Sequence, residues 1–257
     1  MTPLPYRLRE NTGPRLGLIV LQADETCEGD FRRLLPDNAS LLVSRVPSGT
    51  DVTPDTLGEM EGNLASAAML FPVGVTFDAL GYACTSAAAQ IGTASITAEI
   101  RTGTSATEIT DPVTALIAAC RTLGITRLAL LSPYIESVSA RLREVLSEAG
   151  VSTPVFASFD EAEEAKVARI DPDSVAEAAL GMMDSTTADA LFLSCTNLRT
   201  LSIIPDLERR LGMQLTEWPS LIAEDSTVLQ PGMVLTLEPG IDLGAGRTLV
   251  HEENIVI

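Results

Sequence analysis

The sequence has very few of the side chains on which most enzyme chemistry depends. Its 257 residues include one histidine, His251, and one lysine, Lys166. A single histidine cannot form a multi-histidine metal site, and a Ser-His-Asp triad would have to use His251, close to the chain end. A Schiff-base enzyme would have to use Lys166, which follows an acidic stretch. The sequence also lacks a phosphate-binding loop and a dinucleotide-binding glycine motif, so cysteine is the nucleophile that remains.

Positive charge and long apolar runs are scarce as well. The chain has 17 basic and 35 acidic residues, which gives a formal net charge of −18. Such a surface repels nucleic acid and anionic membranes, so neither is expected as a partner. The longest apolar run near the start, residues 16–21, is too short to span a bilayer and lacks the flanks of a signal peptide. We therefore expect a cytoplasmic protein with reduced thiols, and a homodimer is the default oligomer.

Short apolar runs alternate with segments of helical pattern along most of the chain. Buried strands are expected at residues 15–22 and 73–82, and again at 127–131 and 190–194. Helices are expected between them, for example at residues 53–70. This alternation predicts an α/β protein with parallel sheets flanked by helices.

The pattern of predicted strands and helices divides the chain into four parts. We expect a flexible arm at residues 1–14, a first α/β half at 15–108, a second at 109–210, and a β-rich tail at 211–257. The two halves are predicted to be pseudo-symmetric, because in each a strand runs directly into a Cys-Thr pair and then into a helix. The tail is atypical, since its apolar stretches are separated by glycine- and proline-rich turns.

Cys84 and Cys195 occupy the equivalent places in the two halves, between a strand end and the expected start of a helix. Ligands of α/β proteins bind at such places. A helix N-terminus favours a carboxylate ligand and a thiolate, and by itself lowers a cysteine pKa of about 8.5 by roughly one unit. We therefore predict that both cysteines are catalytic. Side-chain donors are expected beside them at Thr85, Ser86, Thr196 and Asn197.

A simpler explanation exists for every cysteine, because cysteine is also a common small buried hydrophobe. It is the preferred explanation for Cys120, in the middle of a predicted helix, and for Cys27, which could alternatively border the pocket. For Cys84 and Cys195 the repeated placement favours catalysis instead.

The chain resembles the aspartate/glutamate racemase superfamily over about residues 15–211. The resemblance rests on Cys84-Thr85-Ser86, Ser132-Pro133-Tyr134 and Ser194-Cys195-Thr196-Asn197. It looks closest to the branch with maleate cis–trans isomerases and the isomerase-like proteins of ectoine-utilisation operons. The resemblance implies two thiols on opposite sides of a substrate, no metal or organic cofactor, and a hydrogen bond from Tyr134 to a substrate carboxylate. Superfamily decarboxylases keep only the second cysteine. The alternative role for Tyr134 is to anchor a loop.

The first strand–helix loop departs from the isomerase pattern. It reads Gln22-Ala23-Asp24, where maleate isomerases have an asparagine after a serine pair. A carboxylate at Asp24 would repel a dicarboxylate or pair with a substrate amino group, and the loop at Glu163-Glu164 is also acidic. We therefore expect an amino acid, or an N-acylated diamino acid from ectoine breakdown, in preference to maleate.

The tail resembles a different family, the pita-bread metallopeptidases of the ectoine hydrolase type. Its anchors are Pro231-Gly232-Met233, Leu237-Glu238-Pro239-Gly240 and His251-Glu252-Glu253-Asn254-Ile255. By this resemblance Glu238 and Glu252 match two metal-binding glutamates, but the other ligands are missing, so we expect solvated residues and no metal site. The change of resemblance indicates an in-frame fusion near Leu211-Gly212.

The sequence thus favours a cofactor-independent isomerase or racemase acting on a small carboxylate or amino-acid derivative, in ectoine degradation. Two alternatives stay open: an inactive fusion remnant, or a binding protein for an ectoine-derived amino acid. A metallopeptidase would explain only the tail, which is too short for an independently stable domain.

Overall fold

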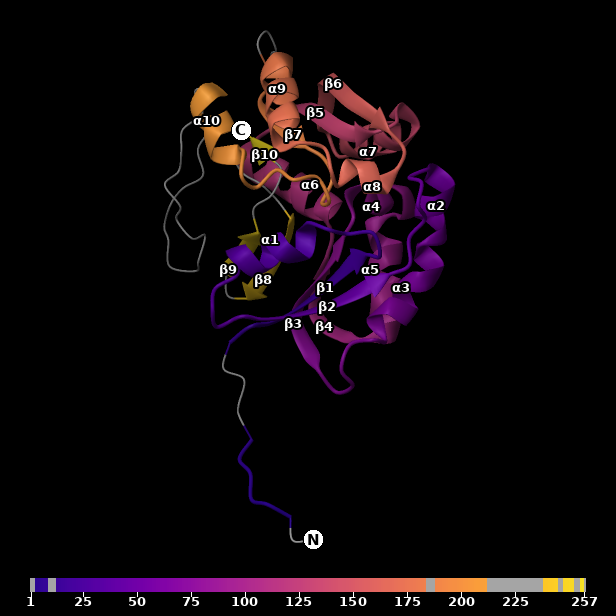
Figure 1. Cartoon of the computed structure of the whole chain (residues 1–257), viewed down its shortest axis with the longest axis vertical. Coiled ribbons are helices and arrows are strands. Elements are labelled where there is room, and N and C mark those ends of the chain that lie inside the picture. Colours follow the sequence, from indigo (N-terminus) through magenta and orange to yellow (C-terminus); the bar gives the residue numbers. More distant parts are fainter. Residues whose placement is uncertain are drawn as a thin grey trace.

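The computed structural model describes residues 3–8, 13–183, 188–211, 238–244, 247–251 and 255–256. Within these residues two four-stranded sheets, each flanked by helices, make up the body (Figure 1). The predicted α/β class with parallel sheets is correct. Residues 3–8 belong to no helix or strand and extend away from the body.

The first sheet has the strand order β2-β1-β3-β4, and all of its pairings are parallel. Its strands are β1 (Arg15–Leu21), β2 (Ser40–Val46), β3 (Thr76–Ala83) and β4 (Ser105–Thr110). The helices of this half are α1 (Cys27–Leu34), α2 (Pro54–Glu59), α3 (Glu61–Ala68), α4 (Thr85–Ile91) and α5 (Thr93–Gly103).

The second sheet has the order β10-β7-β5-β6, in which the last three strands are parallel. Its strands are β5 (Arg127–Tyr134), β6 (Ser152–Glu161), β7 (Ala190–Leu193) and β10 (Ile255–Val256). The accompanying helices are α6 (Pro112–Leu123), α7 (Glu136–Glu148), α8 (Glu164–Val167), α9 (Pro172–Met183) and α10 (Ile204–Leu211).

The first three strands of each half are arranged in the same order. In the first, β1 lies between β2 and β3; in the second, β5 lies between β6 and β7. The position that β4 fills beside β3 is filled beside β7 by β10, which comes from the tail and runs antiparallel. The rest of the described tail is a hairpin of β8 (Glu238–Gly244) and β9 (Arg247–His251), which lies near β3, β4 and α6.

Local chemistry explains where several helices begin and end. Thr53 caps α2 through the N–H of Thr56, and Pro54 occupies the first turn. The Asp111 carboxylate accepts from the N–H groups of Val113 and Thr114 at the start of α6, and α6 ends at Gly124, whose φ is 69°.

The structure differs from the sequence prediction in several elements, α5 and α8 among them, which were not predicted as separate helices. The helix expected at residues 53–70 is divided into α2 and α3, and β4 is a strand that was not predicted. The helix expected directly after Cys195 begins only at Ile204. An earlier start would put Pro205 in a helix interior, where it cannot donate a hydrogen bond, whereas the observed start puts it in the first turn.

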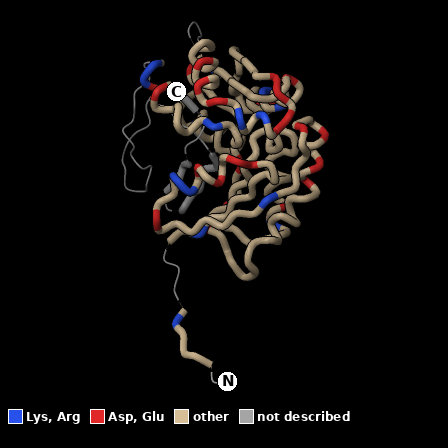
Figure 2. The backbone as a smooth tube through the Cα atoms, viewed as in Figure 1, with Lys and Arg blue, Asp and Glu red and all other residues tan. Residues whose placement is uncertain are grey.

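One hydrophobic core extends through both halves, from Ile19 and Leu80 in the first to Leu130 and Phe192 in the second. Acidic residues lie on the elements of both halves, as Figure 2 shows. Among the described residues no helix is both long and apolar enough to cross a membrane.

Candidate active site

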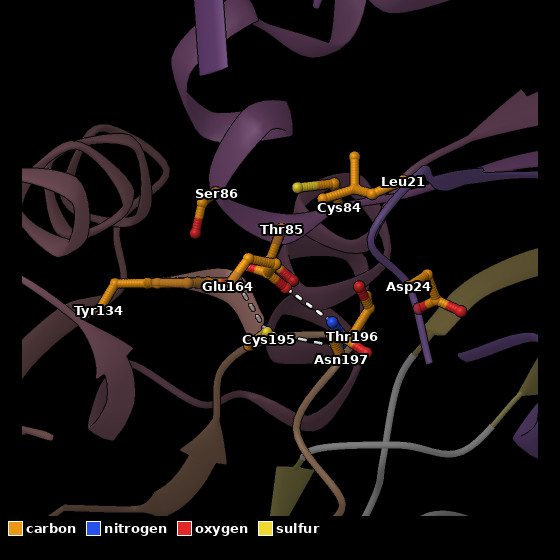
Figure 3. A pocket seen from close by; sticks show the side chains of 10 residues that line it. All are labelled: Leu21, Asp24, Cys84, Thr85, Ser86, Tyr134, Glu164, Cys195, Thr196 and Asn197. Atoms are coloured by element: carbon orange, nitrogen blue, oxygen red, sulfur yellow. Dashed lines mark hydrogen bonds between the residues drawn. The ribbon is translucent and has the colours of Figure 1, made fainter. Parts of the chain in front are cut away.

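A small pocket lies where the two halves meet, and Figure 3 shows its lining side chains. The space between its lining atoms is about 240 Å³ with open solvent included, and it has almost no room for a water molecule. The ten lining residues are Leu21, Asp24, Cys84, Thr85, Ser86, Tyr134, Glu164, Cys195, Thr196 and Asn197. All eight residues that the sequence predicts for the site are in this set, and Leu21 and Glu164 are additions.

Cys84 follows β3 directly and is the N-cap residue of α4, as predicted. Its sulfur accepts a hydrogen bond from the N–H of Ala87 at 3.4 Å, and its side chain is buried. Thr85 and Ser86 form the first turn of α4 and are buried beside the sulfur. A Cys84 thiolate would therefore gain from a backbone donor and from the positive end of the helix.

Cys195 comes just after β7, but no helix begins there. Its φ of 117° lies in a region that residues with a side chain rarely adopt. The sulfur accepts from the N–H of Asn197 at 3.3 Å and lies 3.0 Å from the hydroxyl of Tyr134. The expected helix N-terminus at this cysteine is therefore replaced by a strained turn and a tyrosine.

Glu164 is the residue that sequence reasoning missed. It is the first residue of α8 and is 2% exposed. One carboxylate oxygen accepts from the hydroxyl of Tyr134 at 2.9 Å, and the other accepts from the side-chain amide of Asn197 at 2.8 Å. The acidic pair Glu163-Glu164 was the available signal. Local sequence could not tell which of the two enters the pocket.

Asn197 also joins the halves. Its side-chain amide donates to the carbonyl of Ala23 at 3.2 Å, and its side-chain oxygen accepts from the N–H of Glu25 at 2.8 Å. Thr26 donates to the Asn197 carbonyl, and Thr196 donates to the carbonyl of Ala83. The donors predicted at Thr196 and Asn197 are thus engaged within the protein, and they fix the two halves around the pocket.

Asp24 lies at one side of the pocket, and its carboxylate has local partners. It accepts from the N–H groups of Cys27 at 3.2 Å and Glu28 at 3.4 Å, at the start of α1. Arg45 donates to the carbonyls of Leu21 and Asp24. Burial raises the pKa of Asp24, and these hydrogen bonds oppose the rise.

The closed site keeps both sulfurs protonated at neutral pH, contrary to the lowered pKa expected from the helix argument. Burial raises the pKa of Cys84 to about 12, although the N–H of Ala87 opposes the rise. Burial also raises the pKa of Cys195 well above its usual value, and the charge of Glu164 adds to the effect. The error has a physical cause: desolvation of a fully buried thiol outweighs one helix terminus.

Three other residues considered for chemistry are not among the described lining residues of the pocket. Cys120 is buried within α6, and Lys166 is exposed on α8, where it pairs with Glu163 and Glu161. Cys27 is buried at the start of α1, in the cluster with Phe31. The described part of the chain contains no group of three or more histidine, cysteine or acidic residues that could hold a metal ion.

Of the metallopeptidase-like positions in the tail, Glu238 opens β8 opposite His251 of β9. Glu252 lies outside the described residues.

Two family models match the chain. The model described as arylmalonate decarboxylase matches residues 87–221, more than half of the sequence, and that of metallopeptidase family M24 matches residues 202–257. The predicted resemblances to the maleate isomerase branch and, for the tail, to a metallopeptidase family are confirmed at this level. The two matches overlap only at residues 202–221, around the predicted change at Leu211-Gly212.

Two curated relatives match most of the chain. Arylmalonate decarboxylase of Bordetella bronchiseptica is 28% identical over 214 residues, which cover 80% of this chain and 86% of the relative. Maleate isomerase of Geobacillus stearothermophilus is 26% identical over 232 residues, which cover 83% and 88%.

Solved structures share the fold. A maleate isomerase from Pseudomonas putida S16 with maleate, a cysteine-to-alanine variant, has a TM-score of 0.67 and 21% identity over 78% of this chain and 85% of that one. A liganded double variant of arylmalonate decarboxylase, glycine to cysteine and cysteine to serine, has a TM-score of 0.67 and 28% identity over 77% and 85%. A Nocardia farcinica maleate cis-trans isomerase variant with a covalently bound succinylcysteine intermediate has a TM-score of 0.65 and 22% identity over the same shares.

Proposed function

Because the chain belongs to the arylmalonate decarboxylase and maleate isomerase family, we propose that it is a cofactor-independent isomerase or racemase. The observation that carries the proposal is the meeting of Cys84 and Cys195, one from each half, in a single pocket. Each cysteine follows the equivalent strand, β3 or β7, so the two sulfurs approach a bound ligand from different halves. Two opposed thiols suit a reaction that takes a group from one face of a carbon and restores it from the other.

Two reactions fit this arrangement. In racemisation, one thiolate removes the proton from Cα and the opposite thiol delivers its proton to the other face. In cis–trans isomerisation, a thiolate adds to the double bond, the new single bond rotates, and loss of the thiolate restores the alkene. The succinylcysteine in the Nocardia farcinica isomerase supports a cysteine as the attacking group in a relative of the same fold.

The surroundings of Cys195 provide a route for its proton. The hydroxyl of Tyr134 donates to Glu164, so it is able to accept from the thiol of Cys195. Burial raises the pKa of Glu164, which makes it a better proton acceptor than an exposed glutamate. We infer that a Cys195 thiolate forms as its proton moves toward Glu164, with Tyr134 between them.

The resemblance of the tail to ectoine hydrolases supports a role in ectoine degradation, and the M24 match over residues 202–257 agrees with that origin. We propose that the chain joins two neighbouring coding regions in frame, that it acts in the cytoplasm, and that its substrate is an amino acid or an acylated diamino acid. The carboxylates of Asp24 and Glu164 at the pocket support this substrate class.

A decarboxylase is less well supported. The liganded arylmalonate decarboxylase had a cysteine introduced in place of a glycine, whereas this chain has two cysteines at the pocket. A binding protein without turnover is the second candidate, and the raised pKa values of both thiols favour it.

Exchange of substrate Cα–H in heavy water tests for racemisation, and conversion of a cis alkene to its trans isomer tests for isomerisation. We expect exchange with the wild-type chain and a loss of at least roughly 100-fold in Cys84→Ala and Cys195→Ala, because each variant lacks one proton carrier. Candidate small carboxylates and amino acids would be compared by NMR. Neither exchange nor cis–trans conversion with any of them, and no difference among the three proteins, would leave the binding protein as the function.

A further inference from the structure

We propose that Glu164 determines the substrate class, by restricting the pocket to ligands with one carboxylate and a separate ammonium group. The inference rests on the proposed function, because it concerns the same pocket between Cys84 and Cys195. It goes further in naming the residue and the charge pattern that select the ligand.

Glu164 already occupies two of the pocket's hydrogen-bond donors. Its carboxylate oxygens accept from the hydroxyl of Tyr134 at 2.9 Å and from the side-chain amide of Asn197 at 2.8 Å. All three side chains are almost completely buried and line the pocket. A ligand carboxylate at this place would have to displace a carboxylate that is part of the chain.

Among the described residues, the lining has no positive charge to offset a second ligand carboxylate. It includes the carboxylates of Asp24 and Glu164 and no lysine, arginine or histidine. Arg45, whose charge acts on Asp24, donates to Glu28 and to backbone carbonyls at the end of β1 and in the loop after it. A dicarboxylate would therefore face two like charges in a poorly solvated space, while an ammonium group would be attracted to them.

The lining also includes neutral donors that the protein itself does not use. Thr85 and Ser86 line it beside Cys84, and their hydroxyls form no hydrogen bond to the described residues. In Figure 3 Glu164 is drawn beside Thr85, while Ser86 lies to the left of Cys84 and Asp24 to its right. The pocket thus offers neutral donors to a single carboxylate and two carboxylates to an ammonium group.

Aspartate and 2,4-diaminobutyrate test this directly, because they share the chain length and the α-amino carboxylate and differ at the far end. Isothermal titration calorimetry would give both dissociation constants for the wild type, for Glu164→Gln and for Glu163→Gln. Glu163 is the matched control, since it is the adjacent glutamate and its side chain is 54% exposed. We expect the wild type and Glu163→Gln to prefer 2,4-diaminobutyrate by roughly tenfold or more, and Glu164→Gln to lose most of that preference.

The wild-type measurement alone can overturn the inference, even if Glu164→Gln does not fold. A preference for aspartate, equal affinity, or no binding of either compound would each contradict it, as would an unchanged preference in a folded Glu164→Gln protein. The same titrations on Cys195→Ala separate the two proposals. If Cys195→Ala keeps the preference for 2,4-diaminobutyrate and the wild type shows no proton exchange, the selectivity is supported and the proposed proton transfer is rejected. If the wild type shows exchange but prefers aspartate, the proton transfer is supported and the selectivity is rejected.

Discussion

The phenolic oxygen of Tyr134 lies 3.0 Å from the sulfur of Cys195. The same oxygen donates its only proton to Glu164, 2.9 Å away. Cys195 is therefore the donor in its own contact with Tyr134, and the protonation states of the three side chains are linked. Cys195, Tyr134 and Glu164 thus form one hydrogen-bonded row, so a change at Tyr134 or Glu164 should alter the reactivity of Cys195.

Replacing Tyr134 with phenylalanine should make Cys195 less reactive. Once a proton has passed to Glu164, the hydroxyl is free to donate to the Cys195 thiolate and lowers the pKa of that cysteine, so its loss raises this pKa further. A hydrogen bond to a charged group contributes about 1.5–3 kcal/mol, so alkylation by iodoacetamide should slow by roughly tenfold to a hundredfold. Peptide mass spectrometry would follow Cys195 separately from the other cysteines. An unchanged rate would show that the hydroxyl does not act on this sulfur.

Replacing Glu164 with glutamine should have two opposite effects. The Glu164 charge raises the pKa of both Cys84 and Cys195, so its removal should move the alkylation profile of both thiols to lower pH. Proton exchange on the substrate should nevertheless fall, because the acceptor at the end of the row is lost. Glu163→Gln is the control for both measurements, and equal behaviour of the two variants would contradict the role of Glu164.

The protein should be more stable at about pH 5 than at about pH 7.5. Burial raises the pKa of Asp24, Asp111 and Glu164. The native state therefore keeps protons that the unfolded chain, with carboxyl pKa values of about 4, has already lost. The stabilisation is complete below the unfolded pKa and disappears as the pH rises through the folded one. Glu161 and Asp189 have lowered pKa values but lie near the surface, so their opposing effect is weak.

Urea denaturation at the two pH values measures this difference. A combined Asp24→Asn and Glu164→Gln variant should show a flatter pH dependence than the wild type. A wild-type free energy of unfolding that rises from the lower pH to the higher would show that the buried carboxylates do not dominate.

Glycine should be tolerated better than alanine at Cys195 and worse at Cys84. The φ of Cys195 is 117°, where a Cβ is strained, so Cys195→Gly should be more stable than Cys195→Ala by roughly 1 kcal/mol. Cys84 has a φ of −157°, an ordinary extended value, so glycine there only adds flexibility to the unfolded chain. Thermal unfolding of the four variants checks the reversal, which a uniform preference for alanine would contradict.

The sequence was sufficient to find the pocket because its signals were local. Cys84 and Cys195 each follow a short apolar run, and strand ends of parallel sheets gather at one edge. The matching strand orders of the two sheets explain why similar local patterns led to equivalent places.

Glu164 could not be found in the same way, because a long-range pairing brings it into the pocket. The N–H of Val52 donates to Ala162 at 2.7 Å, and the N–H of Glu164 donates to Thr50 at 3.2 Å. These contacts join segments that are distant in sequence, and no periodicity shows them. The pKa of the thiols was misjudged for a related reason, since burial depends on how completely the halves close.

That closure also limits how quickly the pocket can be reached. Each lining residue is less than 8% exposed, and the two halves are joined by Asn197 and by the pairing of residues 50–52 with 162–164. A ligand gains access only when some of these contacts break, so the parting of the halves sets an upper limit on its association rate. In stopped-flow mixing, the observed rate should therefore level off at high ligand concentration, and a variant such as Asn197→Ala should raise that ceiling.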